Sequence, residues 1–490
     1  MYTNQYIIYS HSEKNYIPEG CEKKLFQNLT VIHHKKLNCS IYSGEDRQIL
    51  LLGYILDPLD PNLSNDDIVK YLCDSCLYTN KIIERLQNYS GRFVIFYKNS
   101  NTFIALTDAC GLRQLFYFTD PTGNTTFASY PKLIFDFLGI TPLLSSETEN
   151  LIKSNEFRLN ESPWFGNSWI DKRFMKILPN HYLDIDNLTN KRTPLFYKNL
   201  DANNISEYFI NFFYGSYRAI RKRYDHLIQP LTAGWDSRIL LAASKEMLNE
   251  IDYYIFISSY KQLKEPDPLI ANRIATNEKM NFKTILTSEL KDNFLTEYKD
   301  ICFYPRTLPK TRNIQWHYYN NRHRNVININ GNAAGIFRRG YYPINIENSY
   351  NQKMFFRAIN IDSYFNNEMD QWYKEALPYA KENNLNILEI FYWEQRMGHW
   401  GALYPYEQDV AMEEFSPFNN KDFLLTLLLL DVKQRRSNCL ICEALIKKMW
   451  PQLMREPINP ISGLSLKKRI RPFLNRRPKT KKILKKIIHL

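Results

Sequence analysis

Residues 231–238 read Leu-Thr-Ala-Gly-Trp-Asp-Ser-Arg, and this stretch decides the fold. Apolar residues precede it at 226–230 and follow it at 239–243, which predicts a strand, a tight turn and a helix that starts near Asp236. Gly234 lets the backbone approach a bound group closely, and amides at a helix start carry partial positive charge. The stretch therefore predicts a phosphate site. The Gly-Lys-Ser/Thr ending of a Walker loop is missing, which argues against a P-loop of that kind.

Strand-like and helical runs alternate around this loop. Residues 226–231, 253–257, 283–286 and 325–330 are predicted strands, and helices are predicted after Ser237 and over 269–279. This alternation favours a parallel sheet, whose ligands lie beyond the carboxyl ends of its strands. From about residue 351 onward the pattern is mainly helical.

The first 190 residues have a different pattern, rich in short strands. Runs at 91–97 and 102–107 flank a polar four-residue connection, which predicts a hairpin. Residues 127–134 predict a strand that leads into a helix. We expect layered sheets with helices here, joined to the rest by a polar linker that begins near residue 184.

Length and composition indicate a globular protein of two or three domains, with 490 residues and 44% hydrophobic content. No apolar run is long enough to span a membrane and the start lacks a signal-peptide pattern, so we expect a cytoplasmic location. Two Cys-x-x-Cys pairs, Cys73/Cys76 and Cys439/Cys442, could each supply half a zinc site. Their apolar, helical context favours cysteines that act as small hydrophobes.

The net charge of +13 is concentrated in the tail, where eleven Lys and Arg residues lie within 467–486. A short apolar face at 483–488 could let residues 467–490 contact an anionic surface. The alternative, a frayed solubilising end, is the favoured interpretation.

The loop resembles the pyrophosphate-binding loop of asparagine synthetases, Leu-Ser-Gly-Gly-x-Asp-Ser. Thr232 matches the serine, Ala233 matches the first glycine, and Gly234, Asp236 and Ser237 are unchanged. Upstream, Asp-Ala-Cys-Gly-Leu-Arg-Gln-Leu-Phe-Tyr at 108–117 and Phe-Ala-Ser at 127–129 resemble the family's amino-terminal stretches in the same order. The similarity extends over most of residues 45–460.

The resemblance implies an α/β protein with an Ntn-hydrolase-like α+β sandwich at residues 1–190. A PP-loop (adenine-nucleotide α-hydrolase-like) parallel-sheet domain with a helical extension would follow at 200–465, and then a basic tail at 466–490. It also implies ATP and Mg²⁺ as cofactors, a carboxylate substrate activated as its acyl-adenylate, and ammonia or an amine as the nitrogen donor. A homodimer is a further expectation. Asp236 would bind magnesium and act with Ser237 in catalysis, while Leu231, Thr232, Ala233 and Gly234 complete the pyrophosphate loop.

The amino-terminal half departs from the family where glutamine would be hydrolysed. The family's nucleophile is a cysteine at the exposed first position, but residue 2 is Tyr2 and the first cysteine is Cys21. The Asn-Gly pair of the oxyanion hole is matched by Leu52-Gly53, which removes the side-chain donor. We therefore expect no glutaminase activity.

The second family motif, Ser-Gly-Glu-Gly-Ala-Asp-Glu-x-Phe-Gly-Gly-Tyr, is matched at 330–341. Its magnesium-binding aspartate falls at Gly335 and a neighbouring glutamate at Ile336. Further candidate residues for the nucleotide are Gly331, Arg338 and Arg339, where the arginines could grip phosphate or could be ordinary surface residues. Candidates for the substrate pocket are Asp267, Tyr341 and Arg396. Asp267 could instead cap a helix, and His399 is expected to pack beside tryptophan.

Three hypotheses follow. The leading one is an ATP-dependent carbon–nitrogen ligase without its own glutaminase. The second is a catalytically degenerate homologue that binds a nucleotide or a partner, because Gly335 and Ile336 remove acidic groups. The third is an RNA-modifying adenylating enzyme, suggested by the basic charge but opposed by the glutaminase-like first half.

Overall fold

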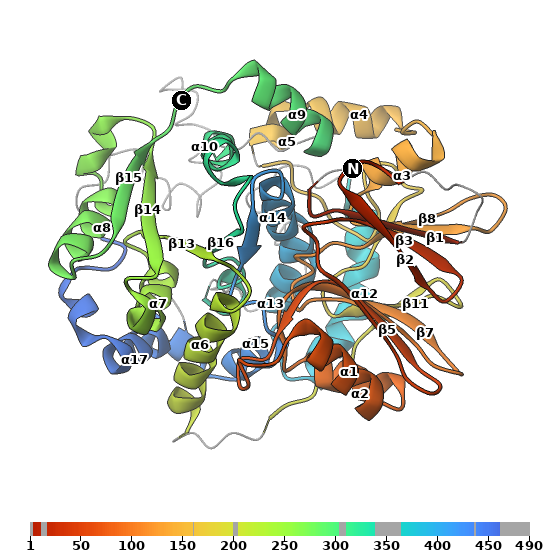
Figure 1. Cartoon of the computed structure of the whole chain (residues 1–490), viewed down its shortest axis with the longest axis horizontal. Coiled ribbons are helices and arrows are strands. Elements are labelled where there is room, and N and C mark those ends of the chain that lie inside the picture. The colour runs from red at the N-terminus through yellow and green to blue at the C-terminus, as the bar shows by residue number, and fades with distance from the viewer. Residues whose placement is uncertain are drawn as a thin grey trace.

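The computed structural model describes residues 3–10, 17–159, 161–198, 204–302, 310–338, 364–435 and 438–460. It has three sheets, two antiparallel and one parallel, with helices on their faces (Figure 1). This is the α/β arrangement expected from the sequence, a sandwich followed by a parallel-sheet domain with a helical extension. Residues 1–2, Arg339, Tyr341 and the basic tail lie outside the described residues.

The first antiparallel sheet has the order β10-β8-β9-β1-β3-β2. Its strands are β1 (Tyr6–Ser10), β2 (Cys21–Phe26), β3 (Leu29–His34), β8 (Phe116–Thr119), β9 (Thr125–Ala128) and β10 (Met175–Lys176). The second has the order β12-β11-β7-β6-β5-β4. Its strands are β4 (Cys39–Ser43), β5 (Gln48–Leu56), β6 (Ser90–Lys98), β7 (Phe103–Thr107), β11 (His181–Asp184) and β12 (Thr189–Arg192).

Alternating side chains of these strands build the sandwich. On β1, Tyr6 and Ile8 face the core between the two sheets, whereas Ile7 and Tyr9 belong to the apolar cluster on the other side. This period of two is what a strand buried on both faces requires. The outer face of the second sheet is covered by α1 (Asn65–Ser75) and α2 (Thr79–Leu86). The predicted 91–107 hairpin is confirmed as β6 and β7.

The parallel sheet has the order β15-β14-β13-β16-β17, and every neighbouring pair in it is parallel. Its strands are β13 (His226–Pro230), β14 (Ile251–Ile257), β15 (Phe282–Leu286), β16 (Val326–Ile329) and β17 (Glu413–Phe415). The first four were predicted. β17 was not, since the region after residue 351 was read as mainly helical, and three residues are too few to show a strand period.

Helices complete this half and connect it to the sandwich. Besides α1 and α2, the part of the chain before residue 205 contains α3 (Pro131–Leu138), α4 (Ser146–Lys153) and α5 (Asn155–Leu159). Around the parallel sheet lie α6 (Ile205–Arg221), α7 (Trp235–Ala243), α8 (Pro266–Asn277), α9 (Asp292–Cys302), α10 (Thr311–Asn321) and α11 (Gly335–Arg338). The extension contains α12 (Asn366–Glu382), α13 (Ile387–Phe391), the π-helix η4 (Tyr392–Gly401), α14 (Ala402–Gln408), α15 (Lys421–Leu428), α16 (Val432–Arg435) and α17 (Leu440–Met449). Short 3₁₀ turns are η1 (Lys245–Met247), η2 (Tyr260–Lys264) and η5 (Pro451–Arg455).

The two Cys-x-x-Cys pairs differ from each other. Cys73 and Cys76 are buried free thiols, in agreement with their interpretation as small hydrophobes. Cys439 and Cys442 form a disulfide, so that interpretation is wrong for this pair. The start of α17 brings their Cα atoms to 5.2 Å, which is within the normal range for a disulfide. Among the described residues, no helix is long and apolar enough to cross a bilayer.

Candidate functional site

The loop at 231–234 leaves β13 where the strand order of the parallel sheet reverses. β14 and β15 lie on one side of β13, while β16 and β17 lie on the other. Clefts for ligands form at such switch points, because the loops leave neighbouring strands in opposite directions. The loop after β16, which contains Gly331, ends at the same edge.

The loop is held by its own side chains. The Thr232 and Ser237 hydroxyls are 2.9 Å apart, and the amide of Gly234 donates to Thr232 Oγ1 over 3.2 Å. Ser237 Oγ also donates to the Thr232 carbonyl. Gly234 is the N-cap of α7 and brings no side chain to the helix start. The fold thus fixes the turn and leaves the first turn of α7 facing the cleft.

Asp267 reaches this loop from the start of α8. Its Oδ1 accepts a hydrogen bond from the amide of Ala233 over 3.0 Å, although the N-cap of α8 is Glu265. The helix-cap interpretation of Asp267 is therefore wrong, because the carboxylate braces the loop. Leu231, the first residue of the loop, is fully buried.

Arg338 forms a two-point ion pair with Asp236. Arg338 Nε lies 2.5 Å from Asp236 Oδ1, and Nη2 lies 2.7 Å from Oδ2. Such a fork is the strong geometry for guanidinium and carboxylate. Gly331 makes room for it, since a Cβ there would lie 2.6 Å from Asp236 Cβ. Arg338, which was expected to lie near phosphate, is therefore at the loop, but its guanidinium is bound to the carboxylate of Asp236.

The residues around Asp236 do not fit a magnesium ion. Mg²⁺ binds through carboxylate oxygens, and both oxygens of Asp236 are bound by Arg338. At Gly335 a Cβ would lie 2.3 Å from the Tyr392 hydroxyl, so that ring fills the space of a second acidic side chain. No group of three metal-binding side chains occurs in the part of the chain that the structure describes.

The loop opens on a cleft of about 480 Å³. Its lining includes Pro230, Tyr254 and Phe256, and also Thr232, Asp236, Ser237, Asn330, Gly331 and Arg338. Lys310 also lines the cleft and lies 4.5 Å from the ring centre of Tyr404. The lining of the cleft therefore combines apolar and aromatic side chains with hydroxyl, amide and charged groups, among them the cations of Lys310 and Arg338.

Two further described residues, Arg396 and His399, are not among those that line this cleft. The Arg396 guanidinium lies 4.2 Å from the ring centre of Trp400. His399 is buried and bonded through Nε2 to the carbonyl of Gly166 at 2.7 Å. Burial lowers the pKa of His399 to about 3, helped by the charge of Lys176, so its imidazole is neutral.

Two described residues of the amino-terminal half, Leu52 and Cys21, bear on the expectation about glutamine hydrolysis. Leu52 is fully buried between the two antiparallel sheets, so it presents no donor for an oxyanion. Cys21 is buried, and burial raises the pKa of its thiol, which opposes the thiolate that attack requires.

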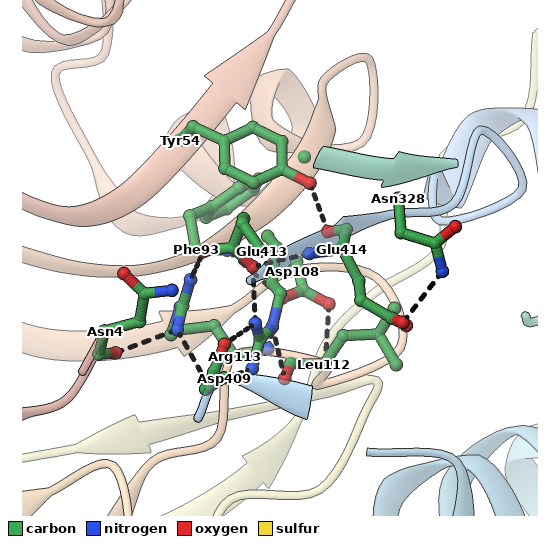
Figure 2. Close-up of polar contacts among 12 residues, drawn as sticks. Asn4, Tyr54, Phe93, Asp108, Leu112, Arg113, Asn328, Asp409, Glu413 and Glu414 are labelled. Carbon is green, nitrogen blue, oxygen red and sulfur yellow. Dashed lines mark hydrogen bonds and ion pairs between the residues drawn. The ribbon is translucent and has the colours of Figure 1, made fainter. Parts of the chain in front are cut away.

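Sequence reasoning missed a buried ionic cluster between the two halves (Figure 2). We call Arg92, Arg113, Asp409 and Glu413 the interface cluster. Arg92 Nη1 and Nη2 donate to Asp409 over 2.5 and 2.7 Å, and both arginines also donate to Glu413. All four residues are buried. No local sequence signal marks this cluster, because its partners lie about 300 positions apart.

The cluster continues toward the cleft through Glu414. Its carboxylate accepts hydrogen bonds from Asn328 and Asn330, at 3.0 and 2.7 Å, and Tyr54 donates to its backbone carbonyl. Burial raises the pKa of Glu414 to about 7, against the opposing effect of both asparagines. Asn330 directly precedes Gly331, so the sandwich is tied to the loop that lies over Asp236.

No protein-family model matches this chain, and no curated protein matches it either. Among solved structures, a glutamine phosphoribosylpyrophosphate amidotransferase from B. subtilis complexed with ADP and GMP is 12% identical. That match covers 69% of this chain and 71% of the other, with a TM-score of 0.25. A glutamine-dependent NAD⁺ synthetase from Acinetobacter baumannii in complex with ADP is 10% identical over 46% of this chain and 51% of the other, with a TM-score of 0.21.

An ammonia-dependent NAD synthetase from Campylobacter jejuni is 14% identical, with a TM-score of 0.20. The match covers 43% of this chain and 93% of the Campylobacter jejuni chain. Likenesses this low carry no argument about activity, so the function is argued from the site itself.

Proposed function

We propose that the protein is an ATP-dependent carbon–nitrogen ligase that takes ammonia or an amine from outside the chain. The observation that carries this proposal is the cleft, where a braced glycine turn and a helix start lie beside Lys310 and Arg338. The apolar and aromatic side chains of its lining suit a flat base such as adenine, and its two cations suit phosphate. Both features are needed to hold a nucleoside triphosphate.

The chemistry that this cleft supports is carboxylate activation. A substrate carboxylate oxygen attacks the α-phosphorus of ATP, the bond to the β,γ-pyrophosphate breaks, and pyrophosphate leaves. The amine nitrogen then attacks the acyl carbon, AMP leaves, and the nitrogen loses a proton. The hydroxyls of Thr232 and Ser237 would orient the pyrophosphate, and Arg338 would neutralise part of its charge as it leaves.

A second candidate is a nucleotide-binding protein without catalysis. The ion pair of Asp236 with Arg338 favours it, because it occupies the carboxylate that was expected to bind a metal. Tyr392 favours it too, since its ring closes the position at Gly335. Both candidates predict nucleotide binding and differ in whether pyrophosphate is released.

Exchange of labelled pyrophosphate into ATP separates the two. The full chain is assayed with a panel of carboxylates beside a Thr232→Val variant, which loses the hydroxyl that meets Ser237. An Asp252→Asn variant, at a half-buried position near the start of β14, is the control. Exchange that requires one carboxylate and that Thr232→Val reduces would support the ligase. ATP binding without exchange across the panel would favour the second candidate.

A further inference from the structure

A second cavity lies between the sandwich and the helices of the other half. It has a volume of about 780 Å³, within the range of small-molecule sites. Its sandwich side is largely aromatic and is lined by Phe116, Tyr130, Phe157, Trp164 and Trp169. Leu290, Leu295 and Leu403 line the opposite side. We call this space the interdomain cavity.

One buried ammonium group lines this apolar space. Lys176 is only 2% exposed, and its Nζ donates to Gln114 Oε1 over 2.6 Å and to the carbonyl of Gly398. Both acceptors are neutral, and no carboxylate of the described chain forms an ion pair with Lys176. The Nζ atom also lies 5.1 Å from the ring centre of Phe116, and because an ammonium has three donors, one hydrogen bond remains to be made to another acceptor. Burial lowers the pKa of Lys176 to about 7.

Gln114 supplies a second donor at the same place. It is 2% exposed and lines the cavity, and its Nε2 has no hydrogen-bond partner. The lysine fixes the orientation of this amide, because only Oε1 can accept from an ammonium. A buried amide without a partner costs free energy that a bound acceptor would recover.

We propose that the interdomain cavity binds an organic carboxylate with an aromatic or aliphatic body. The carboxylate accepts hydrogen bonds from Lys176 and Gln114 Nε2, and the body packs against the indole and phenyl rings. A single negative charge matches the single buried cation, whereas a phosphate dianion would leave one charge without a partner. The bound carboxylate supplies the counter-charge that the fold does not give to Lys176. This inference is independent of the nucleotide chemistry.

The test measures direct binding to the full chain without nucleotide. Benzoate, phenylacetate and decanoate are titrated while tryptophan fluorescence is followed, and phenylacetamide is the neutral analogue. We expect the acids to bind and phenylacetamide to bind at least tenfold more weakly, since hydrogen bonds to charged groups are worth more than neutral ones. Lys176→Met should weaken acid binding about tenfold or more, and Gln114→Leu about threefold to tenfold.

Lys299→Met is the matched control, because Lys299 is an exposed lysine on the lining of the same cavity. Its charge is screened by water, so acid binding should stay within about twofold of the unaltered protein. If Lys176→Met does not fold, Gln114→Leu and the acid–amide comparison still decide the outcome. Equal binding of acid and amide, or undiminished binding by Gln114→Leu, would overturn the proposal.

The carboxylate could be the substrate of the proposed ligase or a separate ligand. A bound acid that also promotes pyrophosphate exchange is the substrate. A bound acid that leaves exchange unchanged is a separate ligand of the same cavity. Both results support the carboxylate site in the interdomain cavity. If the protein shows no pyrophosphate exchange at all, the ligase proposal is contradicted, and the binding of acids still tests the cavity by itself.

Discussion

The interface cluster and the interdomain cavity both contain buried cations, but they differ in what surrounds the charge. Arg92 and Arg113 each form ion pairs with the buried carboxylates of Asp409 and Glu413. Lys176 is equally buried, and its partners among the described residues are a carbonyl oxygen, an amide oxygen and the ring of Phe116, none of which carries a charge. Burial alone therefore does not mark a functional charge. The difference lies in whether the fold supplies a counter-charge.

Breaking the interface cluster should give the largest effect. Arg113→Met leaves Glu413 and Asp409 with less positive charge in a buried place, which costs about 3–5 kcal/mol of unfolding free energy. Urea unfolding measures this loss. Arg218→Met, which breaks the exposed pair with Glu246, is the control and should cost less than about 1 kcal/mol. Equal losses would show that the buried cluster contributes no more than a surface pair.

Arg338 allows the comparison to be extended to the nucleotide cleft. Arg338→Met removes a cation from the cleft and exposes the charge of Asp236, so ATP affinity should fall about tenfold to a hundredfold. Calorimetric titration with ATP checks this, with Arg218→Met again as control. A gain of affinity in the presence of Mg²⁺ would instead identify Asp236 as a metal ligand that Arg338 conceals.

Acid binding in the interdomain cavity should depend on pH through Lys176. Its neighbours there are His399, which is neutral because its pKa is lowered to about 3, and the uncharged Gln114 and Gly398. The pKa of Lys176 is lowered to about 7, so the ammonium form dominates below that pH and is lost above it. Affinity for benzoate should be constant from about pH 5 to 6.5 and fall up to about tenfold per unit above 7. A flat profile to pH 9 would show that the ammonium does not hold the acid.

Removal of magnesium should have a small effect on ATP binding. Both oxygens of the Asp236 carboxylate are held by Arg338, and Asp267 accepts from the amide of Ala233, so EDTA should change the ATP affinity by less than about threefold. Calorimetric titration with and without EDTA measures this. A loss of more than about tenfold would mean that ATP binding depends on a metal after all.

The stability of Lys176→Met gives the smallest expected change. Because the fold gives this ammonium no counter-charge, its removal should leave the unfolding free energy within about 1 kcal/mol, or raise it. Urea unfolding at pH 6, where the lysine is charged, is the measurement. A loss as large as that of Arg113→Met would assign Lys176 a structural role like that of the interface cluster.

Much of the fold could be predicted from local patterns. The strands at β13, β14, β15 and β16 and the helix after Asp236 follow from apolar runs separated by turn residues, which act over a few positions. β17 could not, because three residues show no period and its stability comes from pairing with β16. The disulfide of Cys439 with Cys442 was also missed, since spacing alone does not distinguish a bonded pair from two buried thiols.

The candidate site was predicted in part. The loop at 231–237 was found from its glycine and hydroxyl residues, and Asp267 was named as a possible neighbour. That Arg338 would bind Asp236 could not be foreseen, because the two residues are 102 positions apart. Nothing in the sequence marked Gln114 or Lys176 either, because the residues around a single glutamine or lysine do not show whether its side chain will be buried beside a cavity.

The sequence by itself determined the order of most elements and the tight turn between β13 and α7, because each of these depends on residues close together in the chain. Only the tertiary structure decided which charges are satisfied. It placed Arg338 on Asp236, closed the position at Gly335 with Tyr392, and left Lys176 without a carboxylate. The physical reason is that electrostatic pairing depends on distance in space, and the partners here come from segments that only folding brings together.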